Sequence, residues 1–522
     1  MSTVAAEHAR AADATAPALA SVRIDSGLIE GIRDGATGLC AWRGIPFAAA
    51  PFGDLRWRAP APVAAWDGVR RADNFSPQCT QPGRAPDSVY AEYSGVQPMS
   101  EDCLYLNVWA PNEPADRGGE ALPVMVWIHG GAFQQGAASN PVFVRGDLAK
   151  QGVVLVTFNY RLGPFGFMAH PALSAEAGGA SGNYGLLDMA AALRWVQRNI
   201  AALGGDPARV TVFGQSAGAH GVIALMAAPE AHGLFRHAIA QSFGLNATPS
   251  LATGEAQGVE FAGGADAEAV ATLRATSADD LLQRYLAQSH RFMPIVDGKF
   301  LQEPLVETFA AGEQQRVPFL TGWTRDEGST FPAASSAASF KTHLLKRFGD
   351  RAAEAERLYP VGSDSEAVTS SRALFGDGLF AGGVVAAANA QAAVAPTWVY
   401  HFAQLQPFKK GQRYRESGVA EPAAVLGVFH SSEYPYIFGT TRVLDRDWGA
   451  DDDRITVSMQ GWWANFAKSG NPNHEGDDQG LPHWPQFDPS GASRSTKPTV
   501  LEIKAEPVLI DIPRKAHLSF LR

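Results

Sequence analysis

The stretch Val210–Ala219, which reads V-T-V-F-G-Q-S-A-G-A, restricts the fold of this chain more than any other. Its first four residues are mostly β-branched or aromatic and predict a short buried strand. Gly214–Gly218 (G-Q-S-A-G) follows, and an Ala-rich apolar run continues to about Ala228, before Pro229. Strand, G-x-S-x-G and helix are the order of a nucleophile elbow, in which glycines let the two backbones approach closely. We therefore predict Ser216 at the tip of a turn, where the positive helix end favours a developing oxyanion.

Apolar strands alternate with helical segments along the chain. The predicted core strands are Cys40–Phe47, Leu104–Ala110, Leu122–Ile128, Val153–Tyr160, Val210–Phe213, His237–Gln241, Val317–Thr321 and Thr397–Phe402. Val22–Ile32 predicts an edge hairpin and Val500–Ile512 two final short strands, and the clearest helix is Leu186–Ala202. This alternation favours an α/β fold whose mostly parallel sheet carries helices on both faces. Two intervals of helical composition, about 250–315 and 332–395, are expected to pack above the carboxyl ends of the strands and to form the walls of an active site there.

Composition bounds the class of protein. With 522 residues, 46% hydrophobic and 18% charged, the chain is long enough for one large core. We expect a flexible tail over residues 1–20, which lacks the pattern of a signal peptide, and one domain over 21–522. The net charge of −10 and the lack of a basic cluster argue against nucleic acid as a partner. No apolar run reaches the length of a membrane span, and we expect a monomer or weak homodimer. Cytoplasmic and exported locations both stay open.

Two downstream segments are candidates to activate the serine. A serine hydroxyl needs a base, and the base needs an orienting carboxylate, in the chain order Ser, Asp/Glu, His for this elbow. Asp326 and Glu327 follow the strand Val317–Thr321, and spacing alone does not choose between them. His430 lies in the loop Gly427–Glu433, after the next core strand. The rival histidines are His401, His474 and His483.

A glycine-rich turn after an early core strand is a candidate oxyanion hole. Gly130 and Gly131 lie in the turn His129–Phe133, directly after Leu122–Ile128. Glycines there let consecutive N–H groups point inward, and the N–H of Ala217 would join them. An ordinary turn between a strand and a helix is the alternative.

Together these motifs resemble the type B carboxylesterases, the family that includes the cholinesterases. Glu101–Val108 is similar to the family's second signature and Phe213–Ala219 to its first. The resemblance continues through Arg43–Ala48, Asn159–Gly163, Gly182–Asp188, Asp326–Ser329, Gly427–His430 and Gly470–Pro472, and covers about residues 21–515. It implies the α/β-hydrolase fold and a serine carboxylesterase that acts on a small-molecule ester without a cofactor or metal.

Matched residue by residue, the resemblance makes Ser216 the nucleophile, Glu327 rather than Asp326 the acid, and His430 the base. The oxyanion hole would consist of Gly130, Gly131 and Ala217.

The resemblance also implies structural contacts. It pairs Arg43 with Glu101 and Arg161 with Asp188 as buried ion pairs, whose loss would leave an unpaired charge in the core. It matches Cys79 and Cys103 to a disulfide, expected if the protein is exported, whereas a reducing cytosol favours thiols. Cys40 would then stay outside the disulfide.

Substrate preference is implied by four positions of the resemblance. Tyr93 stands where cholinesterases have the Trp that stacks on the quaternary ammonium, and an aromatic ring there makes a weaker cation–π contact. Gln288 and His290 stand where acetylcholinesterase has two Phe residues, and Phe331 resembles a wall of the gorge. From these differences we expect a wider, more polar acyl pocket that accepts bulky or aromatic esters.

Two alternatives remain from the sequence. The first is use of the same residues mainly on amide or carbamate bonds. The second is a non-catalytic member, because the family includes adhesion proteins. No metal site is predicted: Asn471–Gly476 resembles the start of a calcium loop, but its twelfth position is Pro482 rather than Glu.

Overall fold

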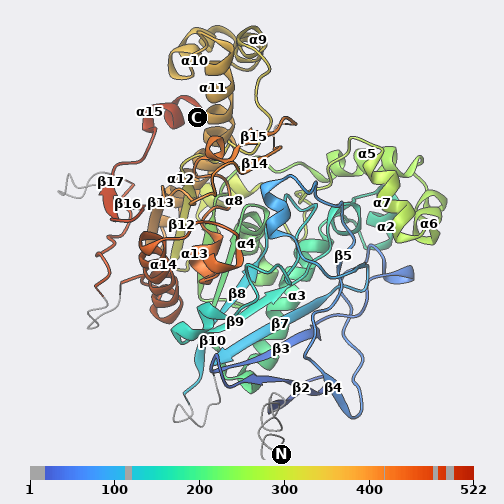
Figure 1. Ribbon diagram of the computed structural model, residues 1–522. Coiled ribbons are helices and arrows are strands. Elements are labelled where there is room, and N and C mark those ends of the chain that lie inside the picture. The colour runs from blue at the N-terminus through green and yellow to red at the C-terminus, as the bar shows by residue number, and fades with distance from the viewer. Residues whose placement is uncertain (1–17, 112–119, 417, 474–479, 490–498) are drawn as a thin grey trace, which may run out of the picture.

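A computed structural model describes residues 18–111, 120–416, 418–473, 480–489 and 499–522. Its centre is a mixed sheet in which the middle strands are parallel and both ends are antiparallel (Figure 1). In spatial order the strands are β1 (Ala18–Ile24), β2 (Gly27–Asp34), β3 (Leu39–Pro46), β7 (Tyr105–Pro111), β9 (Val154–Phe158), β8 (Leu122–Ile128), β10 (Gly205–Gln215), β11 (His237–Gln241), β12 (Phe319–Thr324), β13 (Thr397–Phe402), β16 (Val500–Ile503) and β17 (Val508–Ile510). The predicted α/β-hydrolase fold is confirmed.

Strand β8 shows why the central strands read as uninterrupted apolar runs. Val124, Val126 and Ile128 point into one core, with helices α3 (Tyr184–Asn199) and α4 (Ala217–Ala227). Met125 and Trp127 point into a second core, with α13 (Tyr434–Phe438) and α14 (Ala450–Ser469). Because successive side chains of a strand face opposite ways, both faces of this strand must be apolar.

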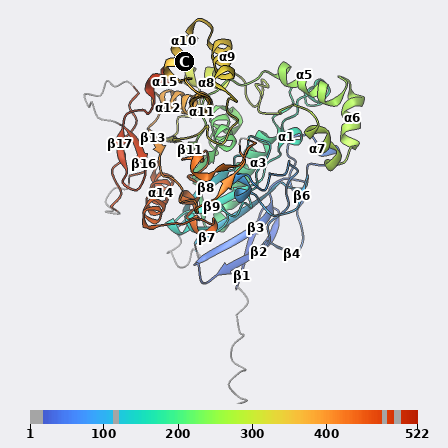
Figure 2. The ribbon, with the colours of Figure 1, turned by 45° about the horizontal axis from the view of Figure 1, so that its top comes forward.

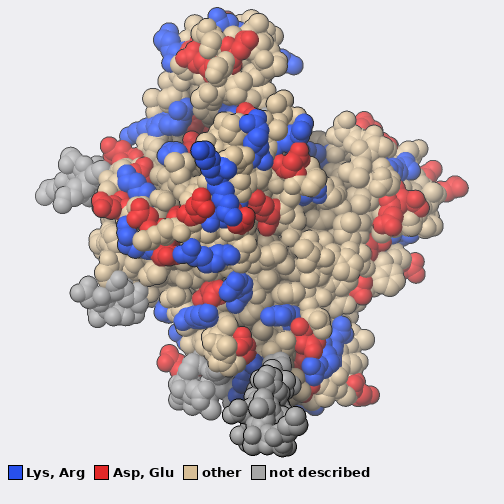
Figure 3. Space-filling model, viewed as in Figure 1, with Lys and Arg blue, Asp and Glu red and all other residues tan. Residues whose placement is uncertain are grey.

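The two predicted helical intervals form separate lobes (Figures 1 and 2). One lobe holds α5 (Leu251–Ala262), α6 (Ala267–Ala275) and α7 (Ala278–Leu286), and the other holds α9 (Ala337–Phe348), α10 (Ala352–Leu358) and α11 (Asp364–Gly376). The last helix of each interval, α8 (Leu305–Ala311) and α12 (Gly382–Ala392), contacts the other, and α12 packs on β12 and β13 of the sheet. Figure 3 shows both signs of charge interspersed on the viewed face, with acidic residues prevailing on the lobe of α5–α7. This pattern agrees with the lack of a basic cluster in the sequence.

Two element boundaries differ from the sequence predictions. Strand β1 begins at Ala18, so the last three residues of the expected tail belong to the sheet. Strand β10 starts at Gly205, five residues before the predicted strand Val210–Phe213, and its register shifts between Gly205 and Val210. Both differences arise because pairing with a neighbouring strand extends an element beyond its apolar core.

By length and composition alone, the helical stretch 364–392 could cross a membrane. The sequence does not reveal it as an uninterrupted apolar run, because polar residues are interspersed. Slightly more than half of its apolar window is buried within the protein. Val384, Val385 and Ala388 of α12 pack in one cluster with Trp323 of β12 and Val399 of β13. The contacts are those of a helix in the core of a folded domain.

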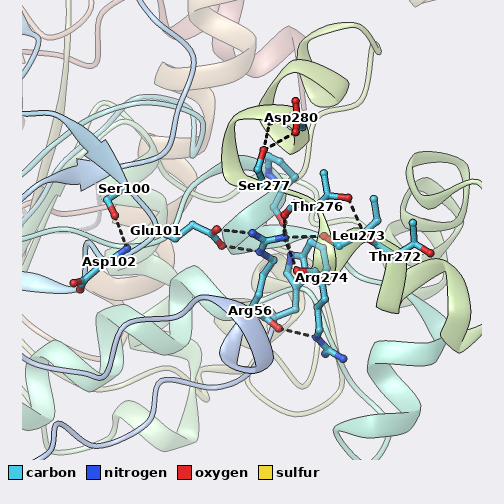
Figure 4. A network of polar contacts seen from close by, with 12 residues as sticks. Arg56, Ser100, Glu101, Asp102, Thr272, Leu273, Arg274, Thr276, Ser277 and Asp280 are labelled. Atoms are coloured by element: carbon cyan, nitrogen blue, oxygen red, sulfur yellow. Dashed lines mark hydrogen bonds and ion pairs between the residues drawn. The ribbon is translucent and has the colours of Figure 1, made fainter.

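The predicted ion pair of Arg43 with Glu101 is wrong. Glu101 instead accepts hydrogen bonds from Nε and Nη2 of Arg56, at 2.7 and 2.5 Å (Figure 4). The Arg43 guanidinium lies over the ring of Phe75, 5.0 Å from its centroid. Sequence pattern does not distinguish Arg43 from Arg56 as the partner of Glu101, because the pairing depends on how the chain folds between them.

The other predicted ion pair and the disulfide are present. Arg161 and Asp188 are buried, and Nη2 of the arginine lies 2.6 Å from Oδ1 of the aspartate. Cys79 and Cys103 form a disulfide with an S–S distance of 2.04 Å. The bond closes a loop of the chain that includes the short helix η2 (Val89–Tyr93).

Candidate active site

Ser216 stands in a sharp turn between β10 and α4. Its φ of +57° is unusual for a residue with a side chain and indicates local strain. A Cβ added at Gly218 would lie 2.0 Å from the Ile128 carbonyl oxygen, and one at Gly214 would lie 2.6 Å from the Gly218 carbonyl carbon. Between residues 210 and 226, Ser216 is the one residue that is not buried. The turn therefore holds the hydroxyl at an accessible position at the end of the sheet.

His430 is bonded to Glu327. Its Nδ1 lies 2.5 Å from Oε2 of Glu327, and both side chains are buried. The other carboxylate oxygen accepts a hydrogen bond of 2.8 Å from the backbone N–H of Thr324. With Nδ1–H donating to the carboxylate, Nε2 carries the lone pair of the neutral imidazole. This is the arrangement of a base held by an orienting acid.

Asp326, which spacing alone could not exclude, has a different place. Its backbone N–H donates to the Val428 carbonyl at 3.0 Å, and its Oδ2 accepts from the Val428 N–H at 2.7 Å. A parallel β-bridge also joins Asp326 to Phe429. The aspartate thus fastens together the two loops that carry Glu327 and His430.

The second nitrogen of His430 faces a buried amide. Nε2 lies 3.2 Å from Nε2 of Gln215, whose Oε1 accepts a hydrogen bond of 2.5 Å from the Tyr434 hydroxyl. Because the tyrosine donates to the amide oxygen, the amide nitrogen is the group that faces the imidazole. Among the described residues, none hydrogen-bonds to the Ser216 hydroxyl, which is therefore not yet engaged with His430.

The glycine turn after β8 lies against Ser216. A Cβ at Gly130 would lie 3.2 Å from the Ser216 Cβ, and one at Gly131 would overlap the Gln135 carbonyl oxygen at 1.8 Å. The backbone of Gly131, Ala132 and Phe133 has positive φ. Neighbouring N–H groups in such a conformation form an anion-binding concavity.

Of the four predicted substrate residues, Phe331 is the one whose described contacts include a candidate catalytic side chain. The ring of Phe331 lies 5.8 Å from that of His430. Tyr93 is buried, with its ring 6.5 Å from Phe429, and its hydroxyl accepts a hydrogen bond of 3.2 Å from Gln406. Among the described contacts, neither Gln288 nor His290 touches Ser216, Glu327 or His430; the His290 ring lies 6.4 Å from that of Phe261.

The rival histidines lie elsewhere. His401 is buried in β13, where its Nδ1 lies 3.6 Å from Oε1 of Glu502. His483 is exposed in the stretch before β16, and His474 lies outside the described residues.

Sequence reasoning missed several residues around His430. The ring of Phe380 lies 4.4 Å from the imidazole, and the Tyr90 hydroxyl donates to the His430 carbonyl at 2.9 Å. Buried Glu433 accepts a hydrogen bond of 3.4 Å from Gln241. Phe380 and Tyr90 lie in an insert and a loop without a local pattern, so no sequence signal marked them. Within the described part of the chain, no cluster of His, Cys, Asp and Glu could hold a metal ion.

The chain is similar to known proteins over nearly its whole length. The sequence model of the carboxylesterase family matches residues 18–521. A fumonisin B1 esterase of Sphingopyxis macrogoltabida is 40% identical over 488 residues, covering 89% of this chain and 84% of that protein. A para-nitrobenzyl esterase of Bacillus subtilis is 37% identical, covering 86% and 89%. A solved PNB esterase structure superposes with a TM-score of 0.80 at 34% identity, covering 96% of this chain and 99% of that one.

Proposed function

Because the chain belongs to the carboxylesterase family and is a carboxylic ester hydrolase, we propose that Ser216, His430 and Glu327 carry out its reaction. The observation that supports this proposal most is the 2.5 Å contact between His430 and Glu327 beside the strained turn of Ser216. Since the protein is an enzyme, the non-catalytic alternative is no longer needed.

In the proposed mechanism, Ser216 Oγ attacks the ester carbonyl carbon while His430 Nε2 takes the hydroxyl proton. Glu327 keeps the proton of Nδ1 in place and stabilises the imidazolium that forms. The N–H groups of Gly130, Gly131 and Ala217 stabilise the oxyanion of the tetrahedral intermediate. The intermediate expels the alcohol, which receives the proton from His430, and leaves an acyl-enzyme. A water molecule activated by His430 then hydrolyses the acyl-enzyme.

The site must change slightly for the first step. Gln215 donates toward Nε2 of His430, where the Ser216 proton has to arrive. A neutral imidazole accepts only one strong hydrogen bond at that nitrogen. Approach of the substrate therefore brings the Ser216 hydroxyl to Nε2 in place of the amide, as hydrogen bonds at a catalytic site often tighten only with substrate bound.

Bulky or aromatic esters are the proposed substrates. Phe331 and Phe380 place two aromatic rings beside His430, at 5.8 and 4.4 Å between ring centroids. Aromatic side chains at such distances offer flat apolar surface for an acyl or alcohol group. The para-nitrobenzyl esterase relative and two cocaine esterases, each 34% identical to this chain, agree with a broad ester preference.

The test is an acyl-enzyme trap. A fluorophosphonate should form one adduct, which peptide mass spectrometry places on Ser216. Hydrolysis of p-nitrophenyl esters from acetate upward should fall by about 10⁴-fold or more in Ser216→Ala. An adduct on another residue, or a variant as active as the parent, would refute the assignment. Matched carbamate and anilide substrates test the alternative reaction in the same assay.

A further inference from the structure

Arg84 is a cation beside the candidate active site that the proposed mechanism does not use. It follows Gln81, Pro82 and Gly83 in the loop closed by the Cys79–Cys103 disulfide. Among the residues that the structure describes, its guanidinium has no ion pair and no hydrogen bond. It lies over the ring of Tyr90, with 5.3 Å from Arg84 Cζ to the ring centroid. A half-buried arginine in this state is unusual, because a desolvated charge is costly without a partner.

The loop is fixed to the turn that carries the proposed oxyanion hole. Gln135 donates to the carbonyls of Pro82 and Gly83, at 3.0 and 3.3 Å. Gln81 accepts from the Gly136 N–H at 2.7 Å and donates to its carbonyl at 2.9 Å. The residues immediately before Arg84 are therefore held against the segment that begins at Gly130.

The other neighbour of Arg84 is fixed to His430. The Tyr90 hydroxyl, which donates to the His430 carbonyl, also lies 2.9 Å from Oγ1 of Thr330. The pKa of His129 is lowered to about 4, mainly by burial and also by the nearby charge of Arg84. Arg84 therefore lies between the oxyanion turn on one side and the base on the other.

The nearby carboxylates of the chain are engaged elsewhere. Glu416 accepts hydrogen bonds from the Ser88 hydroxyl at 3.2 Å and the Val89 N–H at 2.5 Å. Asp87 pairs with Arg415 at 2.7 Å on the surface. The guanidinium keeps its donors available for a planar anion, which it binds through two parallel hydrogen bonds.

We propose that Arg84 binds a free carboxylate of the substrate, so that the enzyme prefers esters carrying a second, ionised carboxyl group. The inference rests on the proposed function and narrows its substrate class. A charge-assisted contact at the rim of the site positions the ester carbonyl between Ser216 and the oxyanion turn. It also raises the rate of encounter with anionic substrates at low salt, despite the net negative charge of the chain.

The experiment compares matched ester pairs. Mono-p-nitrophenyl glutarate and its neutral methyl ester place the charge on the acyl side. 4-Carboxyphenyl butyrate and its neutral methyl ester place the charge on the alcohol side. The quantity compared is the kcat/KM of the charged ester divided by the kcat/KM of its neutral methyl ester. For one of the two pairs, this ratio should be about tenfold higher in the wild type than in Arg84→Gln. Arg84→Glu should lower the ratio further, Arg84→Lys should retain part of it, and added salt should reduce it only where the cation is present.

The control is Arg194→Gln, which removes an exposed arginine that pairs with Glu230 on the outer face of α3. It should leave both ratios at the wild-type values. The proposal is overturned if Arg84→Gln has the wild-type ratio for both pairs. Equal slowing of the hydrolysis of all four esters would also leave both ratios unchanged and would overturn it. Labelling of Ser216 by a neutral fluorophosphonate reports separately on the proposed function. If wild-type protein is not labelled and turns over no ester, the proposed function fails and the inference with it.

Discussion

Glu433, three residues after His430, is a buried carboxyl group without a positive partner among the described residues. It is fully buried, and its Oε2 has no hydrogen-bond partner within the described chain. Burial, together with the nearby charge of Glu327, raises the pKa of Glu433 to about 8. The group is therefore protonated near neutral pH, and the buried charge of Glu327 is not opposed by a second carboxylate.

Glu433→Gln should make the protein less sensitive to alkaline pH. In the folded state Glu433 holds its proton up to about pH 8, whereas in the unfolded chain it loses it near pH 4.5. The unfolded state thus binds fewer protons in that range, and wild-type stability falls as pH rises through it. The variant should gain on the order of 1 kcal/mol per pH unit relative to wild type between about pH 5 and 8. Thermal unfolding from pH 5 to 9 measures the difference, and parallel curves would contradict this account.

At the scale of elements, the turn after β10 depends on two backbones in contact. Gly218 in the first turn of α4 touches the end of β8, where any Cβ would meet the Ile128 carbonyl. The close approach brings the turn of Ser216 to the glycines after β8. The same packing that defines the fold here also assembles the candidate site.

Gly218→Ala should therefore damage folding and activity together. A Cβ 2.0 Å from a carbonyl oxygen forces α4 away from β8. We expect a loss of several kcal/mol of stability, as for other overpacked cores, or no soluble protein. The control is Gly35→Ala, where a Cβ would meet nothing within 4 Å. Yield, thermal midpoint and fluorophosphonate labelling compare the two, and a normal midpoint for Gly218→Ala would refute the prediction.

A second contact between elements joins the disulfide loop to the lobe of α5–α7. Nη1 of Arg56 donates to the carbonyls of Leu273 and Thr276 at 2.7 and 2.8 Å, at the end of α6 (Figure 4). The remaining nitrogens bind Glu101, which precedes Cys103. A guanidinium at the carboxyl end of a helix satisfies carbonyls that have no partner within the helix.

Arg56→Gln should be strongly destabilising. It leaves Glu101 as a buried carboxylate without its cation and removes the donors of two helix-end carbonyls. Breaking one side of a buried pair costs about 3–5 kcal/mol. Arg194→Gln, whose partner Glu230 is exposed, should cost less than about 1 kcal/mol. Thermal unfolding of both variants tests the contrast, which equal losses would disprove.

At the scale of the whole molecule, three histidines near the central sheet are buried or half-buried: His129 and His220 are buried, and His237 at the start of β11 is half-buried. Burial lowers the pKa of His129, His220 and His237 to about 4 in each case. His220 packs flat on Phe243, with 4.8 Å between ring centroids. The protein thus keeps three imidazoles neutral that would be protonated in the unfolded chain below pH 6.5.

Stability should therefore fall as the pH drops from about 6.5 to 4. In that range the unfolded state binds more protons than the folded state, so protonation favours unfolding. His220→Phe should reduce the slope, because it removes one such group and keeps an aromatic ring against Phe243. Thermal midpoints measured from pH 7 to 4.5 test this prediction. An equally steep decline in the variant would show that other groups control acid unfolding.

The sequence by itself determined the elements that depend on local pattern. Strands Leu122–Ile128, His237–Gln241 and Thr397–Phe402 were predicted with the bounds that the structure shows. Their bounds could be predicted because strands buried on both faces are apolar at almost every position. Ser216 and the glycine turn were also evident, since glycine at a fixed position in a turn has a local steric cause.

Only the tertiary structure decided how distant segments meet. It placed Glu327 rather than Asp326 against His430, in agreement with the family resemblance and beyond what spacing could resolve. It replaced Arg43 by Arg56 as the partner of Glu101. It also put Arg84 between the glycine turn after β8 and Tyr90, which is bonded to His430. Such contacts join residues far apart in the chain, and their geometry depends on how the loops pack. Local pattern shows which residues form a strand or turn, whereas the partner of a buried charge is set by the path of the whole chain.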